Sequence, residues 1–127
     1  MMNRPQALII DDQHSNIDVL GMLLEREGIG FTGIAVASTV LDAISQMEKI
    51  DVVFLDLELP NGDYQTLLYA LKDRFSNTPI IAYTVHTNEI ETARQLGFDG
   101  FLGKPLHTTE FSGQIQRILN GEAVWEY

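Results

Sequence analysis

The amino-acid sequence predicts an α/β domain in which a parallel β-sheet of five strands is covered by helices on both faces. Five short apolar runs alternate with segments whose apolar residues recur at helical spacing, and this alternation is typical of repeated strand–helix units. The first and third runs are continuously apolar, as expected for strands buried on both faces. The expected strands are Ala7–Ile10, Phe31–Val36, Val52–Leu55, Ile80–Tyr83 and Gly100–Gly103.

The first three strands are each followed by a predicted amphipathic helix. Ser15 is the expected N-cap of the first helix and Gly28 its C-terminal stop, because hydroxyl side chains favour helix starts and glycine favours helix ends. Ser38 and Asp63 are the expected caps of the second and third helices. The residues expected to face the sheet are, in helix order, Ile17, Leu20 and Leu24; Leu41, Ile44 and Met47; and Leu67, Leu68, Leu71 and Phe75.

The last two strands are followed by helices with clearer ends. The fourth helix is predicted over Glu89–Leu96 with a stop at Gly97, and the fifth over Thr108–Leu119 with Gly121 after it. Their apolar spacing places one face of each helix against the sheet. The residues expected on these faces are Ile90, Ala93 and Leu96 in the fourth helix, and Phe111, Ile115, Ile118 and Leu119 in the fifth.

The strand order follows from the preference for right-handed crossovers between parallel strands. This preference leaves few ways to wind five strand–helix units, and we predict the flavodoxin-like order 2-1-3-4-5. The sequence has no internal repeat, low-complexity segment or linker rich in proline and glycine. We therefore expect one domain over residues 1–127, with its core at about 5–120 and a C-terminal tail at 121–127.

Composition excludes several classes of function. Lysine and arginine number 8 against 18 aspartate and glutamate, a net charge of −10 that argues against direct binding to nucleic acid or an anionic membrane. The absence of cysteine excludes disulfides, zinc–thiolate sites and thiol redox chemistry. No apolar run approaches the length of a membrane span, and Ala7–Ile10 is too short for a secretory signal. We expect a soluble cytoplasmic domain.

Polar residues follow four of the predicted strands at the point where each strand ends. They are Asp11 and Asp12, Asp56, Thr84 and Lys104. Because the carboxyl ends of parallel strands lie at one edge of a sheet, we expect these side chains to converge where the strand order reverses. Any one of them alone would be an ordinary turn residue, helix cap or surface charge. Their conjunction predicts a functional site.

The residue types at this edge favour phosphoryl transfer. Three clustered carboxylates repel one another unless a cation lies among them, and hard oxygen ligands suit Mg²⁺. A lysine and a hydroxyl group beside the cluster suit the oxygens of a phosphoryl group. Asp56 stands alone at the end of the central strand, whereas Asp11 and Asp12 form the paired metal end. Asp56 is therefore the expected nucleophile, which would carry an aspartyl-phosphate.

With these residues in order, the chain resembles the receiver domain of two-component response regulators, a CheY-like fold, over residues 5 to 120. The motifs that carry the resemblance are each weak alone and specific together. They are Ile10-Asp11-Asp12, Asp56-Leu57-Glu58-Leu59-Pro60, Thr84 at a strand end, and Gly103-Lys104-Pro105-Leu106.

The resemblance implies a role for each residue of the site. Asp56 would accept a phosphoryl group from a histidine kinase, a phosphotransfer protein or a small phosphodonor. Asp12 would bind Mg²⁺ (or Mn²⁺) directly and Asp11 through a coordinated water, with Asp56 and the backbone carbonyl of Glu58 as further ligands. Lys104 would bind Asp56 and a phosphoryl oxygen. The protein would catalyse only its own phosphorylation and dephosphorylation, and would not be an enzyme in the usual sense.

The resemblance also implies a conformational switch. Thr84 would move toward the phosphoryl group, and the aromatic ring of Phe101 would turn into the space it leaves. The peptide bond before Pro105 would be cis, as is usual in receivers. The face formed by the fourth helix, fifth strand and fifth helix would then change, which offers a docking surface for a downstream protein or for a homodimer.

Some positions depart from the common receiver pattern. Val85 stands where a small residue is usual, and Glu58 and His86 occupy two positions that tune phosphoryl lifetime in the family. After Pro60 the sequence reads Asn61-Gly62-Asp63-Tyr64 where the family often has Met-Asp-Gly, a departure that bears on the shape of the loop and not on the chemistry. We expect His14 and His107 to be exposed loop residues. Trp125 either docks a partner or packs on the last helix.

Alternatives remain at the level of function. The chain could act as a stand-alone receiver through protein–protein contacts, which its starting methionine and short tail favour, or as a receiver cut from a larger response regulator or hybrid kinase. A pseudo-receiver that never accepts a phosphoryl group is a second alternative. A Mg²⁺-dependent phosphohydrolase with Glu58 as general acid is a third, although the chain is too short for a substrate-binding cap.

Overall fold

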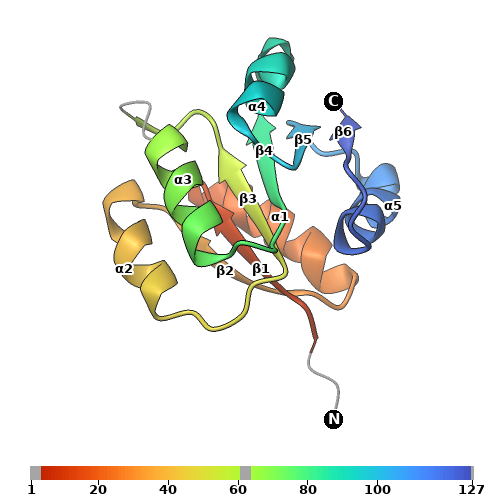
Figure 1. Cartoon of the computed structure of the whole chain (residues 1–127). Coiled ribbons are helices and arrows are strands. Elements are labelled where there is room, and N and C mark those ends of the chain that lie inside the picture. The colour runs from red at the N-terminus through yellow and green to blue at the C-terminus, as the bar shows by residue number, and fades with distance from the viewer. Residues whose placement is uncertain (1–3, 61–63, 127) are drawn as a thin grey trace.

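The computed structural model describes residues 4–60 and 64–126, and a six-stranded parallel sheet forms its centre (Figure 1). The first five strands have the predicted order, with β1 between β2 and β3, followed by β4 and β5. A sixth strand, which the sequence did not predict, lies beyond β5. The strands are β1 (Gln6–Ile10), β2 (Gly30–Ile34), β3 (Val52–Asp56), β4 (Ile80–Thr84), β5 (Gly100–Gly103) and β6 (Trp125–Glu126).

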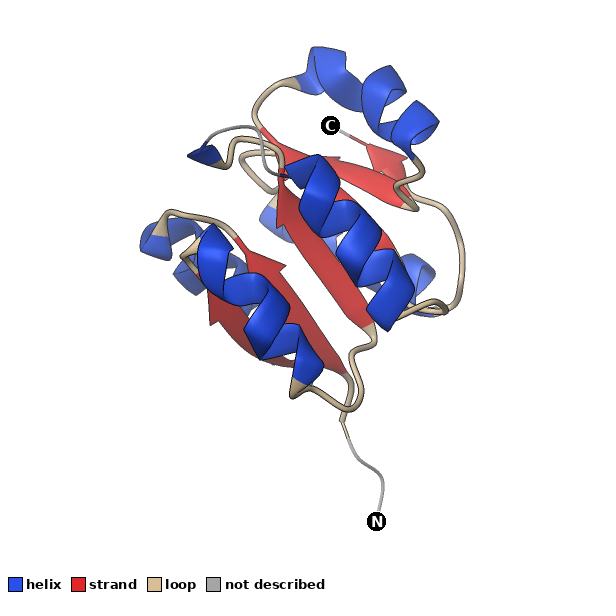
Figure 2. Ribbon diagram, turned by 60° about the vertical axis from the view of Figure 1, so that its left-hand side comes forward, coloured by secondary structure: helices blue, strands red, loops and turns tan. Residues whose placement is uncertain are grey.

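Helices cover both faces of the sheet (Figure 2). Helices α1 (His14–Arg26) and α5 (Thr108–Leu119) pack on one face, and α2 (Val40–Ser45), α3 (Tyr64–Arg74) and α4 (Ile90–Leu96) pack on the other. Two short 3₁₀ helices, Ala37–Thr39 and Thr87–Glu89, lead into α2 and α4. No helix within the described residues is both long and apolar enough to cross a membrane.

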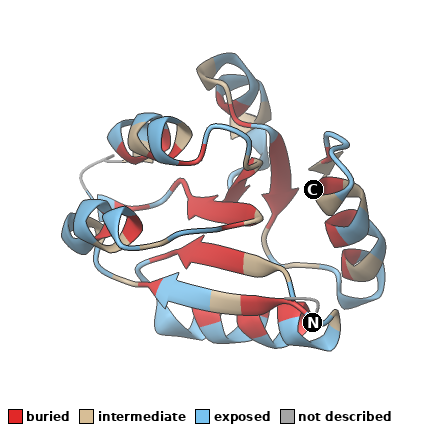
Figure 3. Ribbon diagram, turned by 60° about the horizontal axis from the view of Figure 1, so that its bottom comes forward, coloured by how far each residue is buried: buried red, intermediate tan, exposed pale blue. Residues whose placement is uncertain are grey.

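The core consists of two apolar layers, one on each face of the sheet. Strands β3 and β4 are buried along their whole length, which matches their continuous apolar sequence (Figure 3). Neighbouring residues along these strands point to opposite layers. Phe54 packs with α1 and α5, and Leu55 packs with α2 and α3. This packing fixes where each strand ends along the sheet, and it therefore positions the polar residues that follow the strands.

Two of the expected helix caps are wrong. Helix α1 begins at His14, so Ser15 lies inside it, because the carboxylate of Asp11 accepts a hydrogen bond from the backbone of Gln13 and starts the turn earlier (2.9 Å). Ser38 lies within the 3₁₀ helix before α2 and makes no cap hydrogen bond at the start of that helix. The expected cap Asp63 lies outside the described residues.

The predicted inward position of Leu41 is also wrong. Its side chain is 51% exposed, whereas Val40 and Ile44 of the same helix are buried. Helix α2 has only six residues and begins at Val40, so the pair at spacing i, i+4 that faces the sheet is Val40 and Ile44. Leu41 follows Val40 by one residue, so its side chain points about 100° away from the buried face of the helix.

Residues Trp125–Glu126, which follow α5, form strand β6. Its backbone pairs in parallel with β5, with Trp125 beside Phe101 and Glu126 beside Leu102. Trp125 packs toward the α4 side, where the guanidinium of Arg94 lies 4.6 Å from the centre of its ring. Of the two alternatives for Trp125, packing on the last helix is therefore wrong, because it is Glu126 that faces α5.

Candidate functional site

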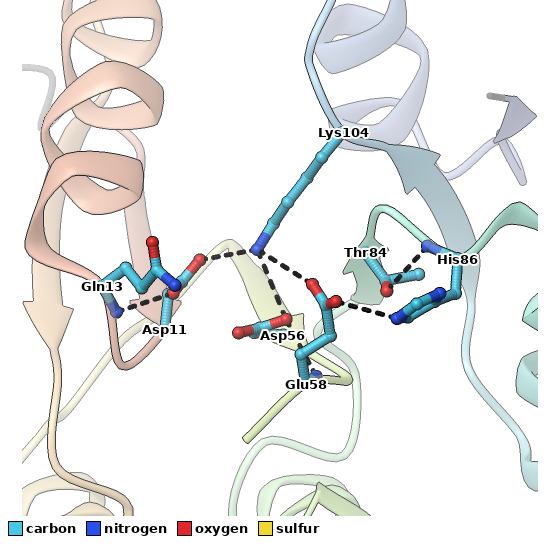
Figure 4. Close-up of polar contacts among 7 residues, drawn as sticks. All are labelled: Asp11, Gln13, Asp56, Glu58, Thr84, His86 and Lys104. Atoms are coloured by element: carbon cyan, nitrogen blue, oxygen red, sulfur yellow. Dashed lines mark hydrogen bonds and ion pairs between the residues drawn. The ribbon is translucent and has the colours of Figure 1, made fainter. Parts of the chain in front are cut away.

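Four strands deliver the predicted polar residues to one edge of the sheet (Figure 4). Asp11 directly follows β1, Asp56 ends β3, Thr84 ends β4 and Lys104 directly follows β5. The side chains of Asp11, Asp56 and Thr84 are almost completely buried. Residues separated by most of the chain therefore meet at the reversal of strand order between β1 and β3.

Three carboxylates form an acidic cluster at this edge. Asp11, Asp12 and Asp56 each contribute an oxygen atom, and these atoms lie within 4.8 Å of one another. Asp12 is the exposed member of the cluster, and the other two are buried. An incoming ion would therefore meet Asp12 first.

The ammonium group of Lys104 joins this cluster. Its Nζ atom lies 2.9 Å from Asp11 Oδ2 and 3.3 Å from Asp56 Oδ1, and the side chain is only 8% exposed. A third carboxylate oxygen, Oε2 of Glu58, lies 3.9 Å away. The backbone N–H of Lys104 donates to the carbonyl oxygen of Thr84, which ties the loop after β5 to the end of β4 (2.8 Å). The Lys104–Pro105 peptide bond is cis, as the resemblance implies.

The aromatic ring of Tyr83 contacts the ammonium group of Lys104, and the sequence analysis did not identify this residue. The ammonium nitrogen lies 4.4 Å from the centre of the Tyr83 ring, a distance suited to a cation–π interaction. Burial raises the pKa of the Tyr83 hydroxyl, and the nearby carboxylates raise it further. Alternation along β4 places the side chain of Tyr83 on the opposite face of the sheet from Thr84. This alternation is the one feature of the sequence that bears on the position of Tyr83.

Backbone N–H groups fix the two buried carboxylates. Asp11 Oδ1 accepts a hydrogen bond from Gln13 N, and Asp56 Oδ1 accepts one from Glu58 N, both at 2.9 Å. Each carboxylate thus caps the turn that follows its own strand. The two acidic side chains are held in place by local sequence as well as by Lys104, which limits the reorganisation needed when charge develops in the site.

Burial makes Asp56 an unusually basic carboxylate. Desolvation raises its pKa to about 6, and the charge of Asp11 adds to this effect. The hydrogen bond from Glu58 N and the charge of Lys104 act in the opposite direction. A higher pKa means that the ionised form gains more from bonding to an electrophile or a cation.

A second polar contact links the site to its rim. His86 Nε2 lies 3.0 Å from Glu58 Oε1, and the backbone N–H of His86 donates to Thr84 Oγ1 (3.1 Å). Glu58 thus lies between His86 and Lys104. Val85 is 51% exposed and lines a cavity of about 470 Å³ together with Glu58, Lys104 and the loop after β5. Pairing between Glu58 and His86 was not apparent from the sequence.

Phe101 lies apart from the acidic cluster. It is buried in the middle of the sheet, between Ala82 of β4 and Trp125 of β6. Ala82 belongs to the same strand as Thr84 and points to the same face, two residues before it. Phe101 therefore pairs with a residue two positions before Thr84 on β4.

The donor set of the site fits a hard divalent cation. Three carboxylates against one ammonium group leave two negative charges uncompensated within the cluster. All the candidate ligand atoms are oxygens, which suits Mg²⁺. Asp11, Asp12 and Asp56 therefore form an acidic cluster typical of the magnesium sites of receiver domains.

Curated relatives of the chain are response regulators and sensor proteins. RegX3, a sensory transduction protein of Mycolicibacterium smegmatis, is 32% identical over 117 residues, which cover 89% of this chain and 50% of that protein. The transcriptional regulator NtrC of Proteus hauseri is 29% identical over 93% of this chain and 25% of its own length. The chain thus spans half or less of these relatives.

Solved structures share the fold over nearly the whole chain. A CheY-like receiver domain protein from Methanospirillum hungatei has a TM-score of 0.81 at 22% identity, covering 94% of this chain and 96% of its own. A two-component response regulator from Clostridium difficile has a TM-score of 0.80 at 28% identity, covering 92% and 97%. A receiver domain of a sensor histidine kinase from Pseudomonas aeruginosa, described with magnesium in its active-site cleft, has a TM-score of 0.79 at 22% identity, covering 93% and 99%.

The family described as "Response regulator receiver domain" matches residues 7–116 of the sequence. This match includes Asp11, Asp12, Asp56, Thr84 and Lys104. The matched residues form a receiver domain of two-component signalling and not a conventional enzyme domain. The chain belongs to the response regulator receiver family.

Proposed function

We propose that the chain accepts a phosphoryl group on Asp56 and passes the signal on through a change in protein contacts. The observation that carries this proposal is the placement of the buried carboxylate of Asp56 beside the ammonium group of Lys104 and within one cluster with the carboxylates of Asp11 and Asp12. This arrangement holds a nucleophile, a group that neutralises phosphoryl charge and a set of cation ligands within one pocket.

The contacts of Asp56 assign separate tasks to its two oxygens. Oδ1 carries both the hydrogen bond from Glu58 N and the contact with Lys104. We therefore assign Oδ2 as the attacking atom. It forms a bond to phosphorus while the P–N bond of a phosphohistidine or the P–O bond of a small acyl phosphate breaks. The imidazole of the histidine or the carboxylate of the acyl phosphate leaves with the electron pair of that bond.

Lys104 binds an oxygen of the transferred group during this step. Its ammonium group sits between Asp11 and Asp56, so it can exchange a carboxylate partner for a phosphoryl oxygen without leaving the pocket. Asp11, Asp12, Asp56 and the backbone carbonyl of Glu58 would hold Mg²⁺, with Asp12 as direct ligand and Asp11 acting through water. When bound, the ion supplies charge neutralisation for the phosphoryl oxygens.

Thr84 and Phe101 are the proposed switch. The Thr84 hydroxyl accepts a hydrogen bond from His86 N and can rotate to donate to a phosphoryl oxygen. Its movement would change the space next to Ala82, where Phe101 packs. The differential contact of Thr84 and Lys104 with the phosphoryl group supplies the free energy that biases the two states.

Glu58, Val85 and His86 are proposed to set the lifetime of the aspartyl-phosphate. The Glu58 carboxylate is held near Lys104 by its contact with the imidazole of His86, so it places negative charge beside the phosphoryl group. Val85 lines the cavity through which water would approach. The three residues thus control charge and access at the rim, without taking part in the bond changes.

The partners follow from the family. Receiver domains work with histidine kinases, and we propose that a histidine kinase or a phosphotransfer protein supplies the phosphoryl group to this chain. We further propose that residues 1–127 form one receiver domain that signals through a downstream protein. Because curated relatives are about two or more times longer, a place in a larger response regulator or hybrid kinase is the alternative.

The test is direct phosphorylation. The protein is incubated with Mg²⁺ and acetyl phosphate, and intact mass spectrometry then measures the fraction that carries one added phosphoryl group. We expect an adduct that maps to Asp56, is labile in base and is absent from Asp56→Asn. Asp51→Asn, at the opposite end of β3, is the matched control and should retain the adduct. A wild-type protein that takes no adduct from acetyl phosphate or from a kinase would instead be a pseudo-receiver.

A further inference from the structure

The outer edge of strand β5 pairs with a short extended segment of the same chain, strand β6 (Figure 1). An edge strand presents unpaired backbone groups that can pair with another chain segment. Here the backbone N–H of Phe101 donates to the carbonyl oxygen of Val124 at 2.7 Å. The edge thus already recognises a short extended segment by main-chain hydrogen bonding.

Gly100 allows the segment to approach this closely. A Cβ atom at position 100 would lie 2.7 Å from the carbonyl oxygen of Val124, a contact that the backbone could not accommodate without shifting. The absence of a side chain at this position is therefore needed for the segment to pair with β5. Position 100 lies at the start of β5, far from the acidic cluster at its other end.

The side-chain contacts of the segment define a recognition pattern. Val124 is buried in the apolar layer between the sheet and α5. Trp125 packs on the opposite layer, with the guanidinium of Arg94 against its ring at 4.6 Å. The edge thus accepts an apolar residue followed by an aromatic residue.

Glu126 completes the pattern with an acidic residue. Its carboxylate receives a hydrogen bond from Gln114 Nε2 and an ion pair from Arg117, each at 2.9 Å. These contacts hold the pKa of Glu126 below its usual value, with the hydrogen bond from Gln114 as the largest cause. In a protein with a net charge of −10, Arg117 makes this edge locally favourable for an acidic residue, whereas Arg94 is paired with Glu91 at 3.0 Å.

The resident segment does not use every contact the edge offers. Strand β6 has only two residues. The buried oxygen of the Gln114 side chain meets no hydrogen-bond donor within residues 4–60 and 64–126. A longer partner segment could extend the pairing and donate to this oxygen, which gives it a free-energy advantage over the resident one.

We propose that the β5 edge binds an extended segment of a partner protein that carries the pattern apolar–aromatic–acidic, and that residues 124–126 are an internal competitor for this site. The partner's aromatic ring would take the place of Trp125 beside Phe101, the residue proposed above as part of the switch. Binding at this edge involves neither Asp56 nor a phosphodonor. It can therefore be tested separately from phosphoryl transfer.

The test uses the full chain and a fluorescent peptide with the sequence of residues 121–127, Gly-Glu-Ala-Val-Trp-Glu-Tyr. The internal segment competes at an effective concentration on the order of millimolar, so wild-type protein should bind the peptide weakly. Trp125→Ala weakens the internal competitor, so the peptide should bind this variant at least about tenfold more tightly. Equal affinity of the peptide for the two proteins would overturn the proposal.

Two further variants test the mode of binding. Gly100→Ala added to Trp125→Ala should abolish peptide binding through the clash with the segment backbone. Arg117→Glu, a change at a half-exposed position, should weaken binding in the same background by at least about tenfold and provides the test if Gly100→Ala does not fold. Binding that is insensitive to Arg117→Glu would overturn the proposal, as would dimerisation of wild-type protein through exchange of β6, which would make a second copy the occupant.

Discussion

The two ends of the same parallel strands use aspartate in different ways. At the amino-terminal edge of the sheet, Asp51 and Asp99 lie before β3 and β5, and each accepts a hydrogen bond from the first residue of a neighbouring strand. The donors are Gln6 N to Asp51 at 2.8 Å and Ile80 N to Asp99 at 2.9 Å. At the carboxyl-terminal edge, Asp11, Asp12 and Asp56 converge instead.

The difference lies in convergence and burial, because the residue type is the same. An isolated carboxylate at the amino-terminal edge satisfies one backbone N–H group and keeps contact with solvent. Asp11 and Asp56 are buried next to each other, so their charges oppose one another and Lys104 compensates only in part. The aspartates at the amino-terminal edge therefore stabilise the fold. The aspartates at the carboxyl-terminal edge repel one another, and a cation or a phosphoryl group can relieve this repulsion.

The largest expected effect comes from removing Lys104 from the carboxyl-terminal edge of the sheet, where Asp11 and Asp56 meet; we call this the convergent edge. Lys104→Met deletes the group that faces both Asp11 and Asp56, and we expect the rate of phosphorylation by acetyl phosphate to fall by about 10²–10³-fold. Lys49→Met is the matched control, because Lys49 pairs with Asp51 at 3.7 Å on the exposed opposite edge. Initial rates measured by intact mass spectrometry give the comparison. Equal losses in the two variants would contradict it.

Stability should respond with opposite sign at the two edges. Burial raises the pKa of Asp56 to about 6 from an ordinary 3.8, so ionised Asp56 destabilises the fold at neutral pH. In the absence of divalent cations, Asp56→Asn should increase the free energy of unfolding at pH 7 by about 1–3 kcal/mol. Asp99→Ala should instead decrease it by about 1 kcal/mol, through loss of the hydrogen bond to Ile80 N.

The pH dependence tests the cause of the Asp56 effect. Because the pKa is raised in the folded state, the penalty is absent below about pH 4, grows between about pH 4 and 6, and is constant above that range. The gap between wild type and Asp56→Asn in urea unfolding, followed by circular dichroism, should change in the same way. Mg²⁺ should narrow the gap at pH 7 by stabilising wild type. A gap that is independent of both pH and Mg²⁺ would mean that desolvation is not its origin.

A smaller effect is expected from the aromatic ring under Lys104. Tyr83→Leu removes the cation–π contact, worth about 1 kcal/mol, and should slow phosphorylation about fivefold, whereas Tyr83→Phe keeps the ring and should retain the wild-type rate. At the other edge, Arg74 stacks on Phe75 at 4.9 Å. Phe75→Leu should therefore lower stability without changing the phosphorylation rate. A rate loss in Tyr83→Phe equal to that in Tyr83→Leu would assign the role to the hydroxyl.

The convergent edge could be predicted from sequence because each of its residues directly follows a strongly apolar strand. Asp11, Asp56, Thr84 and Lys104 need only a correct strand order to meet, and that order follows from handedness. Strand β6 could not be predicted in the same way. Its two residues carry too short a pattern, and its pairing depends on the space above Gly100.

Contacts that depend on the geometry of loops could also not be predicted from the sequence. The Glu58–His86 pair joins the loop after β3 to the loop after β4, and no periodic pattern relates the two positions. The early start of α1 has a similar cause, because the Asp11 carboxylate serves both the site and the first turn of the helix. Sequence rules assign one role to each residue, so they fail where a side chain such as that of Asp11 has two roles.

The smallest expected effect concerns access at the rim of the convergent edge. Val85 lines the cavity that contains Lys104, so Val85→Ala should admit water more readily and speed loss of the phosphoryl group about threefold, equivalent to about 0.6 kcal/mol in the barrier. Val36 is 56% exposed, similar to Val85, but it lies after β2 and outside this cavity, so Val36→Ala should leave the rate unchanged. Decay of the phosphorylated fraction after removal of acetyl phosphate measures both variants. An unchanged rate in Val85→Ala would mean that water reaches the phosphoryl group by another route.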